Sequence, residues 1–151
     1  MAERGAEREL AELRSGWGDE LEASARSADY RERAIAYRAI GQFRFRQKLE
    51  LLRRGLEDES PACRGSALLS LELLSRDHPG DVNADRALLH TLVSDSQENA
   101  AVRRLAVLCL KNGSPQRETI VILEGLAANE EADRELRAVS KRIAELLRQK
   151  R

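Results

Sequence analysis

Aromatic side chains are scarce in this sequence, which has one Trp, two Tyr and two Phe among 151 residues. Strands favour aromatic and β-branched residues, whereas the abundant Leu, Ala, Arg and Glu favour helices. The composition therefore argues against a β-rich fold and for an all-α protein. A chain of this length can bury enough surface to fold as one domain without disulfides or metals.

Cysteine is scarce as well, with Cys63 and Cys109 the only two, and both fall on apolar positions of predicted helices. Two lone cysteines seldom meet the geometry of a disulfide or of a metal site. We therefore expect two small, reduced core residues and no bound metal.

Net charge is lacking too, because 26 basic residues balance 26 acidic ones. This balance argues against a general binder of nucleic acid or of membrane surfaces. It hides segments of opposite sign, since residues 1–30 carry −4, 31–56 carry +6, 57–100 carry −6 and 101–151 carry +4. With a polar start and no long apolar run, we expect a soluble, cytoplasmic protein with local charged patches.

What the chain does contain is an internal repeat. An apolar residue, an arginine, two spacers and a small residue recur, as in Val102 to Ala106. The arginines of the four copies lie 33, 39 and 34 residues apart, at Arg31, Arg64, Arg103 and Arg137. The small residues, which would let paired helices approach closely, are Ala34, Ala67, Ala106 and Ser140. Periods of this size are typical of stacked helical hairpins.

The repeat predicts that residues 1–151 form one array of about three and a half to four hairpins. Its parts are an N-terminal capping hairpin 1–28 that is broken at Ser15 to Gly18, repeats 29–58, 59–95 and 96–130, and a C-terminal capping helix 131–151. Gly41 is predicted to close a helix as a left-handed cap. Ser75 to Asn83 is predicted to be a long polar loop that accounts for the 39-residue spacing.

The recurring arginines are predicted to support the array. Each would pair with an acidic residue in the turn before it and so form a ladder between adjacent repeats. The acidic candidates are Asp29, Asp58, Asp95 and Glu131.

These copies resemble the HEAT-repeat superfamily, in particular its short bacterial and archaeal HEAT-like type, in which an apolar residue, Arg, two variable residues and Ala open the first helix. The resemblance covers about residues 29–151, with Tyr30 at the apolar position of the first copy and Ser140 in place of Ala in the last. It implies a right-handed α-solenoid of stacked antiparallel helical hairpins, whose second helices line a concave surface. In most relatives that surface holds a protein or a peptide.

Some HEAT-like proteins are enzymes, and the sequence argues against most of them. HEAT-like hydroxylases bind iron through adjacent His-Glu pairs, but here His78 precedes proline and His90 precedes threonine. His78 with Asp77 and Asp81 fits a solvated turn better than a metal or acid-base cluster. HEAT-like DNA glycosylases use an electropositive groove with several aromatics, which a neutral, aromatic-poor chain lacks. HEAT-like bilin lyases leave little recognisable motif and stay open as an alternative.

The candidate binding surface lies on the predicted second helices, where charged residues fall away from the inward leucines. The candidate residues are Arg46, Glu50, Arg53, Arg54, Arg86, His90 and Glu124. Such a patch would suit an acidic or phosphate-bearing peptide, and simple solvation of a charged helix face is the alternative.

The sequence therefore predicts a non-catalytic protein-interaction module or adaptor, with no cofactor, that binds a protein or peptide on its concave face. A HEAT-like lyase or enzyme accessory protein is the first alternative, and a nucleic-acid binder with a local basic patch is the second. Trp17 is either a plug over the end of the core or a contact residue for a partner. Self-association and the role of Ser75 to Asn83, for which partner recognition is one hypothesis, are left open.

Overall fold

The computed structural model describes the backbone of residues 2–150 and the side chains of residues 5, 8, 9, 12 and 16–150. Met1 and Arg151, the outermost residues of the predicted domain, lie outside this description. Residues 2–150 contain nine α-helices and one short 3₁₀ helix, η1. Their bounds are α1 Ala2–Ala25, α2 Tyr30–Gln42, η1 Arg46–Lys48, α3 Leu49–Leu56, α4 Pro61–Ser75, α5 Pro79–Ala84, α6 Arg86–Ser94, α7 Ala100–Lys111, α8 Arg117–Ala128 and α9 Arg134–Lys150.

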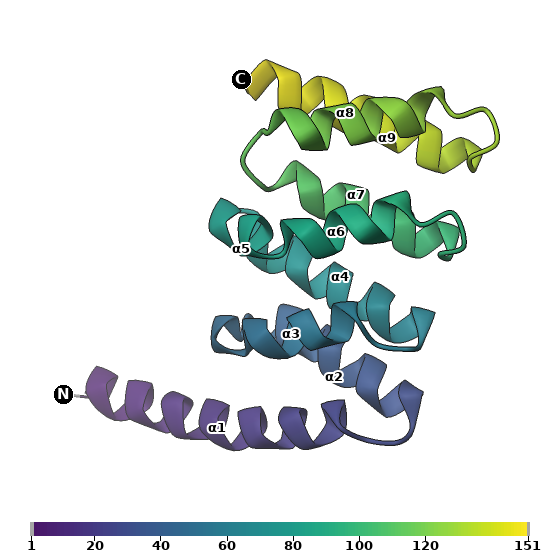
Figure 1. Cartoon of the computed structure of the whole chain (residues 1–151). Coiled ribbons are helices and arrows are strands. Elements are labelled where there is room, and N and C mark those ends of the chain that lie inside the picture. Colours follow the sequence, from purple (N-terminus) through teal and green to yellow (C-terminus); the bar gives the residue numbers. More distant parts are fainter. Residues whose placement is uncertain (1, 151) are drawn as a thin grey trace.

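The helices form two layers. In the first layer α2, α4, α7 and α9 stack on one another in chain order, and in the second layer α1, α3, α6 and α8 run beside them (Figure 1). Figure 1 places α1 and α2 at one end of the array and α8 and α9 at the other. The predicted all-α array of paired helices is thereby confirmed.

Each second-layer helix packs chiefly on the first-layer helix that follows it in the chain, so the close pairs are α1–α2, α3–α4, α6–α7 and α8–α9. Gly55 shows why α3 and α4 lie so close, since a methyl group there would stand only 2.8 Å from the Cβ of Ala67. The predicted boundaries at residues 58, 95 and 130 therefore fall inside the packed pairs.

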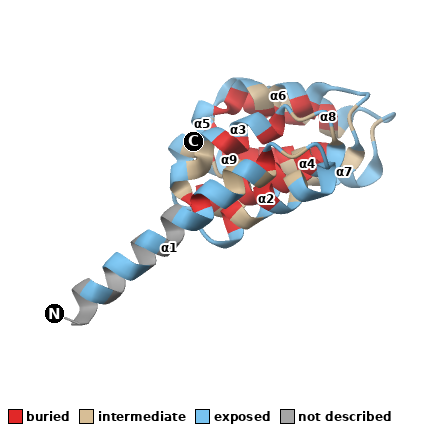
Figure 2. Ribbon diagram, turned by 90° about the horizontal axis from the view of Figure 1, so that it is seen from below, coloured by how far each residue is buried: buried red, intermediate tan, exposed pale blue. Residues whose placement is uncertain are grey.

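One continuous core lies between the layers, as the band of buried residues in Figure 2 shows. Its fully buried members include Leu52, Leu68, Leu110, Leu123 and Ile143, which come from five different helices. Each such side chain contributes about 1.5–3 kcal/mol when it leaves water, so the stacking of pairs stabilises what one pair alone could not. Cys63 and Cys109 are free thiols in this core, as predicted.

The repeat motif is shifted by two residues in its first copy. Arg64, Arg103 and Arg137 are each the fourth residue of their helix, and the fourth residue of α2 is Arg33. Arg33 has a side chain only 11% exposed, whereas that of Arg31 is 76% exposed. Ala36 is buried at 1% exposure, as Ala67, Ala106 and Ser140 are at 0%, and Ala34 is only partly buried. The assignment of Arg31 and Ala34 to the motif is therefore wrong.

The physical reason for this shift is the start of α2. The Asp29 side chain accepts a hydrogen bond from the Arg31 backbone N–H at 3.0 Å and caps the helix. Tyr30 then becomes the first helical residue and stays half exposed instead of entering the core.

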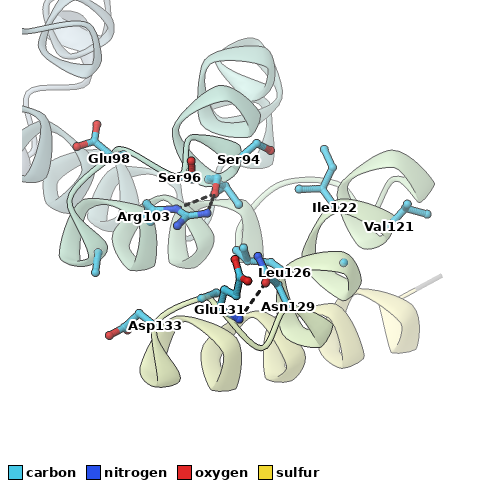
Figure 3. A pocket seen from close by; sticks show the side chains of 14 residues that line it. Ser94, Ser96, Glu98, Arg103, Val121, Ile122, Leu126, Asn129, Glu131 and Asp133 are labelled. Atoms are coloured by element: carbon cyan, nitrogen blue, oxygen red, sulfur yellow. Dashed lines mark hydrogen bonds between the residues drawn. The ribbon is translucent and has the colours of Figure 1, made fainter.

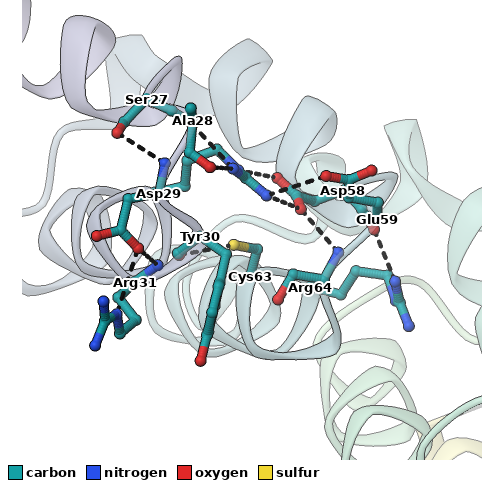
Figure 4. Close-up of polar contacts among 11 residues, drawn as sticks. Ser27, Ala28, Asp29, Tyr30, Arg31, Asp58, Glu59, Cys63 and Arg64 are labelled. Carbon is teal, nitrogen blue, oxygen red and sulfur yellow. Dashed lines mark hydrogen bonds and ion pairs between the residues drawn. The ribbon is translucent and has the colours of Figure 1, made fainter.

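The arginine ladder exists, but its acidic partners come from the turn after each arginine rather than the turn before it. Arg33 binds both oxygens of Asp58 at 2.9 and 3.0 Å, and Arg64 binds both oxygens of Glu98 at 2.6 and 2.7 Å. In the third copy the neighbouring Arg104 takes this role and lies 3.1 Å from Asp133. Figure 4 shows the first junction, around Asp58 and Arg64.

The chain before each motif helix supplies backbone carbonyls instead, from the turn for Arg33 and Arg64 and from the end of α6 for Arg103. Arg33 donates to the carbonyl of Ser27 at 3.0 Å and Arg64 to that of Asp58 at 2.7 Å. Arg103 donates to the carbonyl of Val93 through Nε at 3.0 Å and Nη2 at 2.8 Å. Each arginine thus fixes the connection that leads into its own helix, and two of the three also hold the next unit.

The predicted N-terminal hairpin is wrong, because α1 is one helix that passes through Ser15 to Gly18 without a break. Glycine costs only about 1 kcal/mol relative to alanine inside a helix, and Gly18 has a packing reason. A side chain there would meet the Lys48 side chain at 3.1 Å, and Lys48 reaches across to Glu22 at 3.1 Å. The C-terminal part of α1 is therefore tied to the body and packs on α2.

The segment from Ser75 to Asn83 is not a long loop. It ends α4 at Ser75 and begins α5 at Pro79, where a missing N–H costs nothing. Val82 of α5 is fully buried, so this segment is part of the packed structure. Gly41 also differs from its prediction, since it lies inside α2, and the residue with a left-handed backbone is Arg44 at φ 55.

Candidate protein-interaction surface

Acidic neighbours hold the basic side chains that the sequence placed on the binding surface. Arg46 binds the two oxygens of Asp81 at 2.6 and 3.0 Å and donates to the carbonyl of Leu74 at 3.1 Å. Arg53 lies 3.7 Å from Asp85. These contacts join α3 and η1 to the α5–α6 region and neutralise two of the arginines expected to attract a partner.

The other predicted residues on this face are scattered. Arg54 and Glu50 are exposed, and Arg54 lines a separate depression beside Asp58. Glu124 of α8 is paired with Arg148 of α9. The seven candidates therefore do not form one continuous basic patch.

Arg86 was expected to face outward, and this expectation is wrong because its side chain is buried between α6 and α8. It donates to Thr119 Oγ1 at 2.7 Å, to the Ser114 carbonyl at 2.9 Å, and to the side chain of Asn83. His90 Nε2 lies 2.8 Å from the same Thr119 oxygen. Arg86 therefore joins second-layer helices of neighbouring units and is not available to a partner.

Burial beside Arg86 favours the neutral state of His90. Arginine can only donate, so the Thr119 oxygen accepts from Arg86, and the same hydroxyl shares a hydrogen bond with His90 Nε2 whose direction depends on the imidazole tautomer. Burial lowers the pKa of His90, and the nearby Arg86 charge lowers it further, although Glu118 acts in the opposite direction.

This lowered pKa predicts that stability falls as the pH drops. In the unfolded chain a histidine binds a proton near pH 6.5, while folded His90 resists protonation until a lower pH. The stability that neutral His90 contributes to the fold is therefore fully present above about pH 6.5 and is lost as the pH falls through the lowered pKa. Urea midpoints between pH 5 and 8 should rise with pH in the wild type, and this slope should flatten in His90→Gln. An unchanged slope in the variant would contradict the assignment.

A wide depression of about 560 Å³ lies between the C-terminal parts of α6 and α8 (Figure 3). Its floor is Arg103, which is buried and holds the carbonyl of Val93. One wall is apolar and belongs to α8, where Val121 is 58% exposed and Ile122 and Leu126 also line the depression. Gly125 widens the opening, since nothing lies within 4 Å of the place where its side chain would begin.

Two smaller depressions repeat this arrangement along the array. One of about 350 Å³ lies between α3 and α6 and includes Arg64, and one of about 340 Å³ lies between α1 and α3 and includes Arg33. Each depression thus contains the motif arginine of its unit. The same surface feature recurs three times because the same helix pair recurs.

The edge of the array beside these depressions is acidic. The α3–α4, α6–α7 and α8–α9 turns, residues 57–60, 95–99 and 129–133, contain eight acidic residues and no basic one. Arg33, Arg64 and Arg104 engage four of these, and the other four, Glu57, Asp95, Glu130 and Glu131, are exposed. The depression between α6 and α8 therefore combines an apolar wall with a negatively charged rim.

Sequence reasoning missed this surface, although one signal was present. Residues 120–123 read Ile-Val-Ile-Leu, and four consecutive apolar residues cannot all face one side of a helix. Ile120 and Leu123 are buried and Val121 is exposed. The exposed member of the run, Val121, therefore lies on the apolar wall.

Trp17 takes an intermediate position between its two predicted roles. It is 46% exposed and packs on Phe43 with ring centroids 5.7 Å apart. With Leu21 and Phe45 it lines a depression of about 230 Å³ near the α1 end of the array. The ring covers part of this end without being buried in it.

Neither a metal cluster nor a membrane-spanning helix emerges from the described part of the chain. Among those residues, no three His, Cys, Asp or Glu side chains are grouped to hold a metal ion. None of the described helices is both long and apolar enough to cross a bilayer. Asp81, once a candidate in the His78 turn, is bound by Arg46.

Comparison with known families matches residues 18–95, over half of the chain, to a family model described as HEAT repeats. Searches of curated proteins and of solved structures found no match. The matched range begins within α1 and ends after α6, so it includes the first two motif arginines, Arg33 and Arg64.

Proposed function

We propose, from the premise that this chain belongs to the HEAT-repeat family, that it is a non-catalytic interaction module that holds a segment of a protein partner. HEAT repeats generally serve as protein-interaction scaffolds. The observation that carries the proposal is the depression of about 560 Å³ between α6 and α8, in which an exposed apolar wall meets an acidic rim.

Rigidity supports this role. The ion pairs of Arg33 and Arg64 and the buried contacts of Arg86 fix successive units against each other. A surface that is ordered before binding loses little conformational entropy when a partner docks. The partner segment therefore bears most of the ordering cost.

The charges favour a partner segment with basic residues. The acidic partner expected from the sequence depended on Arg46, Arg53 and Arg54, and the first two are already paired with Asp81 and Asp85. Around the depression, exposed Glu130 and Glu131 leave negative charge, whereas Asp133 is paired with Arg104. We propose an apolar side chain that contacts Val121 and Leu126, flanked by lysine or arginine.

Selection from a displayed library of random linear peptides tests this function. Selected peptides should carry an apolar residue flanked by basic ones and should perturb the amide NMR signals of α6 and α8. Val121→Arg places a bulky positive charge on the apolar wall and should weaken binding at least about tenfold, or 1.4 kcal/mol. Added salt should weaken wild-type binding as well.

Leu69→Arg is the matched control, because it introduces the same charge at another exposed aliphatic residue, on α4 of the first layer. Binding to this variant should remain close to that of the wild type. Peptides that bind Val121→Arg as tightly as the wild type, or that perturb only signals outside α6 and α8, would overturn the proposed site.

A further inference from the structure

The arginine ladder is incomplete at the C-terminal end of the array. Arg33 and Arg64 bind acidic residues of the next unit, and α9 is the last helix of the described residues. Its motif arginine, Arg137, has a buried Nε with no hydrogen-bond partner among the described residues. A buried donor without a partner costs free energy, so this end of the ladder would gain from an acceptor.

The N-terminal end of the array has an acidic residue, Asp29, in a position equivalent to that of Asp133. Asp133 caps α9 through the Leu136 N–H at 3.0 Å and also receives Arg104 from the preceding unit. Asp29 caps α2 in the same way, and its ion-pair partner is Arg31 of its own helix, at 3.4 Å and largely exposed. Asp29 therefore occupies the place of Asp133 without an arginine from a preceding unit.

The apolar surfaces of the two ends match as well. Leu105, the sixth residue of α7, lies against Gly65, the fifth residue of α4, at 3.7 Å from where a Gly65 side chain would begin. The sixth residue of α2 is Ile35, which is 70% exposed, and the fifth residue of α9 is Ala138, a small exposed residue. If a second α2 packed on α9, the large and small residues would meet as they do inside the array.

The segment that would meet Arg137 is acidic. Residues 16–29, which include Asp29 and precede α2, carry a net charge of −3, whereas α2 itself carries +2 and α9 carries +4. We infer that this protein associates head to tail with a second copy, so that α9 of one copy packs on α2 of the next. In that contact Arg137 would reach Asp29 of the next copy, and Ile35 would pack on Ala138.

The order of the helix pairs permits this continuation. The close pairs run from α1–α2 to α8–α9, so the array begins with a second-layer helix and ends with a first-layer helix. A second copy placed after α9 would continue both layers with its own α1 and α2. Because such a contact uses different surfaces on the two copies, it builds longer assemblies rather than a symmetric dimer.

Sedimentation equilibrium of the full chain, at concentrations up to about 1 mM, tests the inference. The mean mass of the wild type should rise with concentration above the 16.9 kDa of one chain. Arg137→Glu blocks the α9 end and Ile35→Arg blocks the α2 end, so each variant alone should remain monomeric. Circular dichroism checks that both variants are folded, and Leu69→Arg, an exposed leucine on α4, should associate like the wild type.

Mixing the two variants gives the deciding result. The Arg137→Glu copy keeps an intact α2 end and the Ile35→Arg copy keeps an intact α9 end, so an equimolar mixture should form dimers and nothing larger. A wild type that stays monomeric up to about 1 mM, variants that assemble alone, or a mixture that stays monomeric would each overturn the inference.

Discussion

Arg64→Ala is expected to lower the free energy of unfolding by about 3 kcal/mol, within the range for removing one partner of a buried ion pair. Arg64 binds both oxygens of Glu98 at 2.6 and 2.7 Å, and these side chains are only 17% and 5% exposed. It also donates to the Asp58 carbonyl at 2.7 Å. The variant leaves a carboxylate almost out of water and without its charged partner.

Arg31→Ala is the matched control, because the sequence pattern assigns Arg31 and Arg64 the same role. The Arg31 side chain is 76% exposed and lies 3.4 Å from Asp29. Exposed ion pairs contribute about 0–1 kcal/mol, so its removal should change stability by less than about 0.5 kcal/mol. Arg33→Ala should resemble Arg64→Ala instead, since Arg33 binds both oxygens of Asp58.

Urea denaturation of the three variants measures these differences, with equal slopes showing that the same surface is exposed on unfolding. From the structure we expect a large loss of stability in Arg64→Ala and Arg33→Ala and a small loss in Arg31→Ala. Losses below about 0.5 kcal/mol in all three variants would mean that the ladder does not stabilise the array. A large loss in Arg31→Ala alone would restore the motif as the sequence spaced it.

The period of the pattern made the architecture predictable. A recurrence every 33 to 39 residues requires one structural unit to repeat. Leucines spaced by three and four residues then predict helices with one buried face. Leu52, Leu56 and Leu71 lie in the core for this reason.

The register of the first motif could not be predicted from the same pattern. Arg31 with Ala34 and Arg33 with Ala36 both place an alanine three residues after an arginine. The choice between them depends on where α2 begins and on which alanine lies against neighbouring helices. Neither quantity is local to the motif, so the pattern fits two registers and the structure uses the second.

The candidate site was less predictable because its residues are defined by distant partners. Arg46 pairs with Asp81 and Arg86 binds Thr119, 35 and 33 residues away in the chain. A helical pattern shows which side of a helix a residue occupies, but not which residue of the next unit faces it. Charged residues that the sequence predicted on a binding surface instead form contacts between neighbouring units.

Gly41→Ala is expected to destabilise the fold by about 2–3 kcal/mol, as overpacking of a tight interface does. Gly41 lies inside α2 where α4 crosses it, and a methyl group there would stand 2.6 Å from the Cα of Ser70. That neighbour is backbone and cannot rotate away. The Gly41 N–H also donates to Ser70 Oγ at 3.0 Å, and this oxygen donates to the Tyr37 carbonyl at 2.5 Å.

Gly125→Ala makes the same chemical change in α8 and should have the opposite sign. Nothing lies within 4 Å of the added methyl group there, so the variant should gain about 0.5–1 kcal/mol from the higher helix propensity of alanine. The same gain acts at Gly41 and must be overcome by the clash with Ser70. Thermal and urea unfolding of both variants therefore separate packing from propensity. Stabilisation by both alanines would show that α2 and α4 are not in close contact at Gly41, and the stacked first layer would then lose its tightest junction.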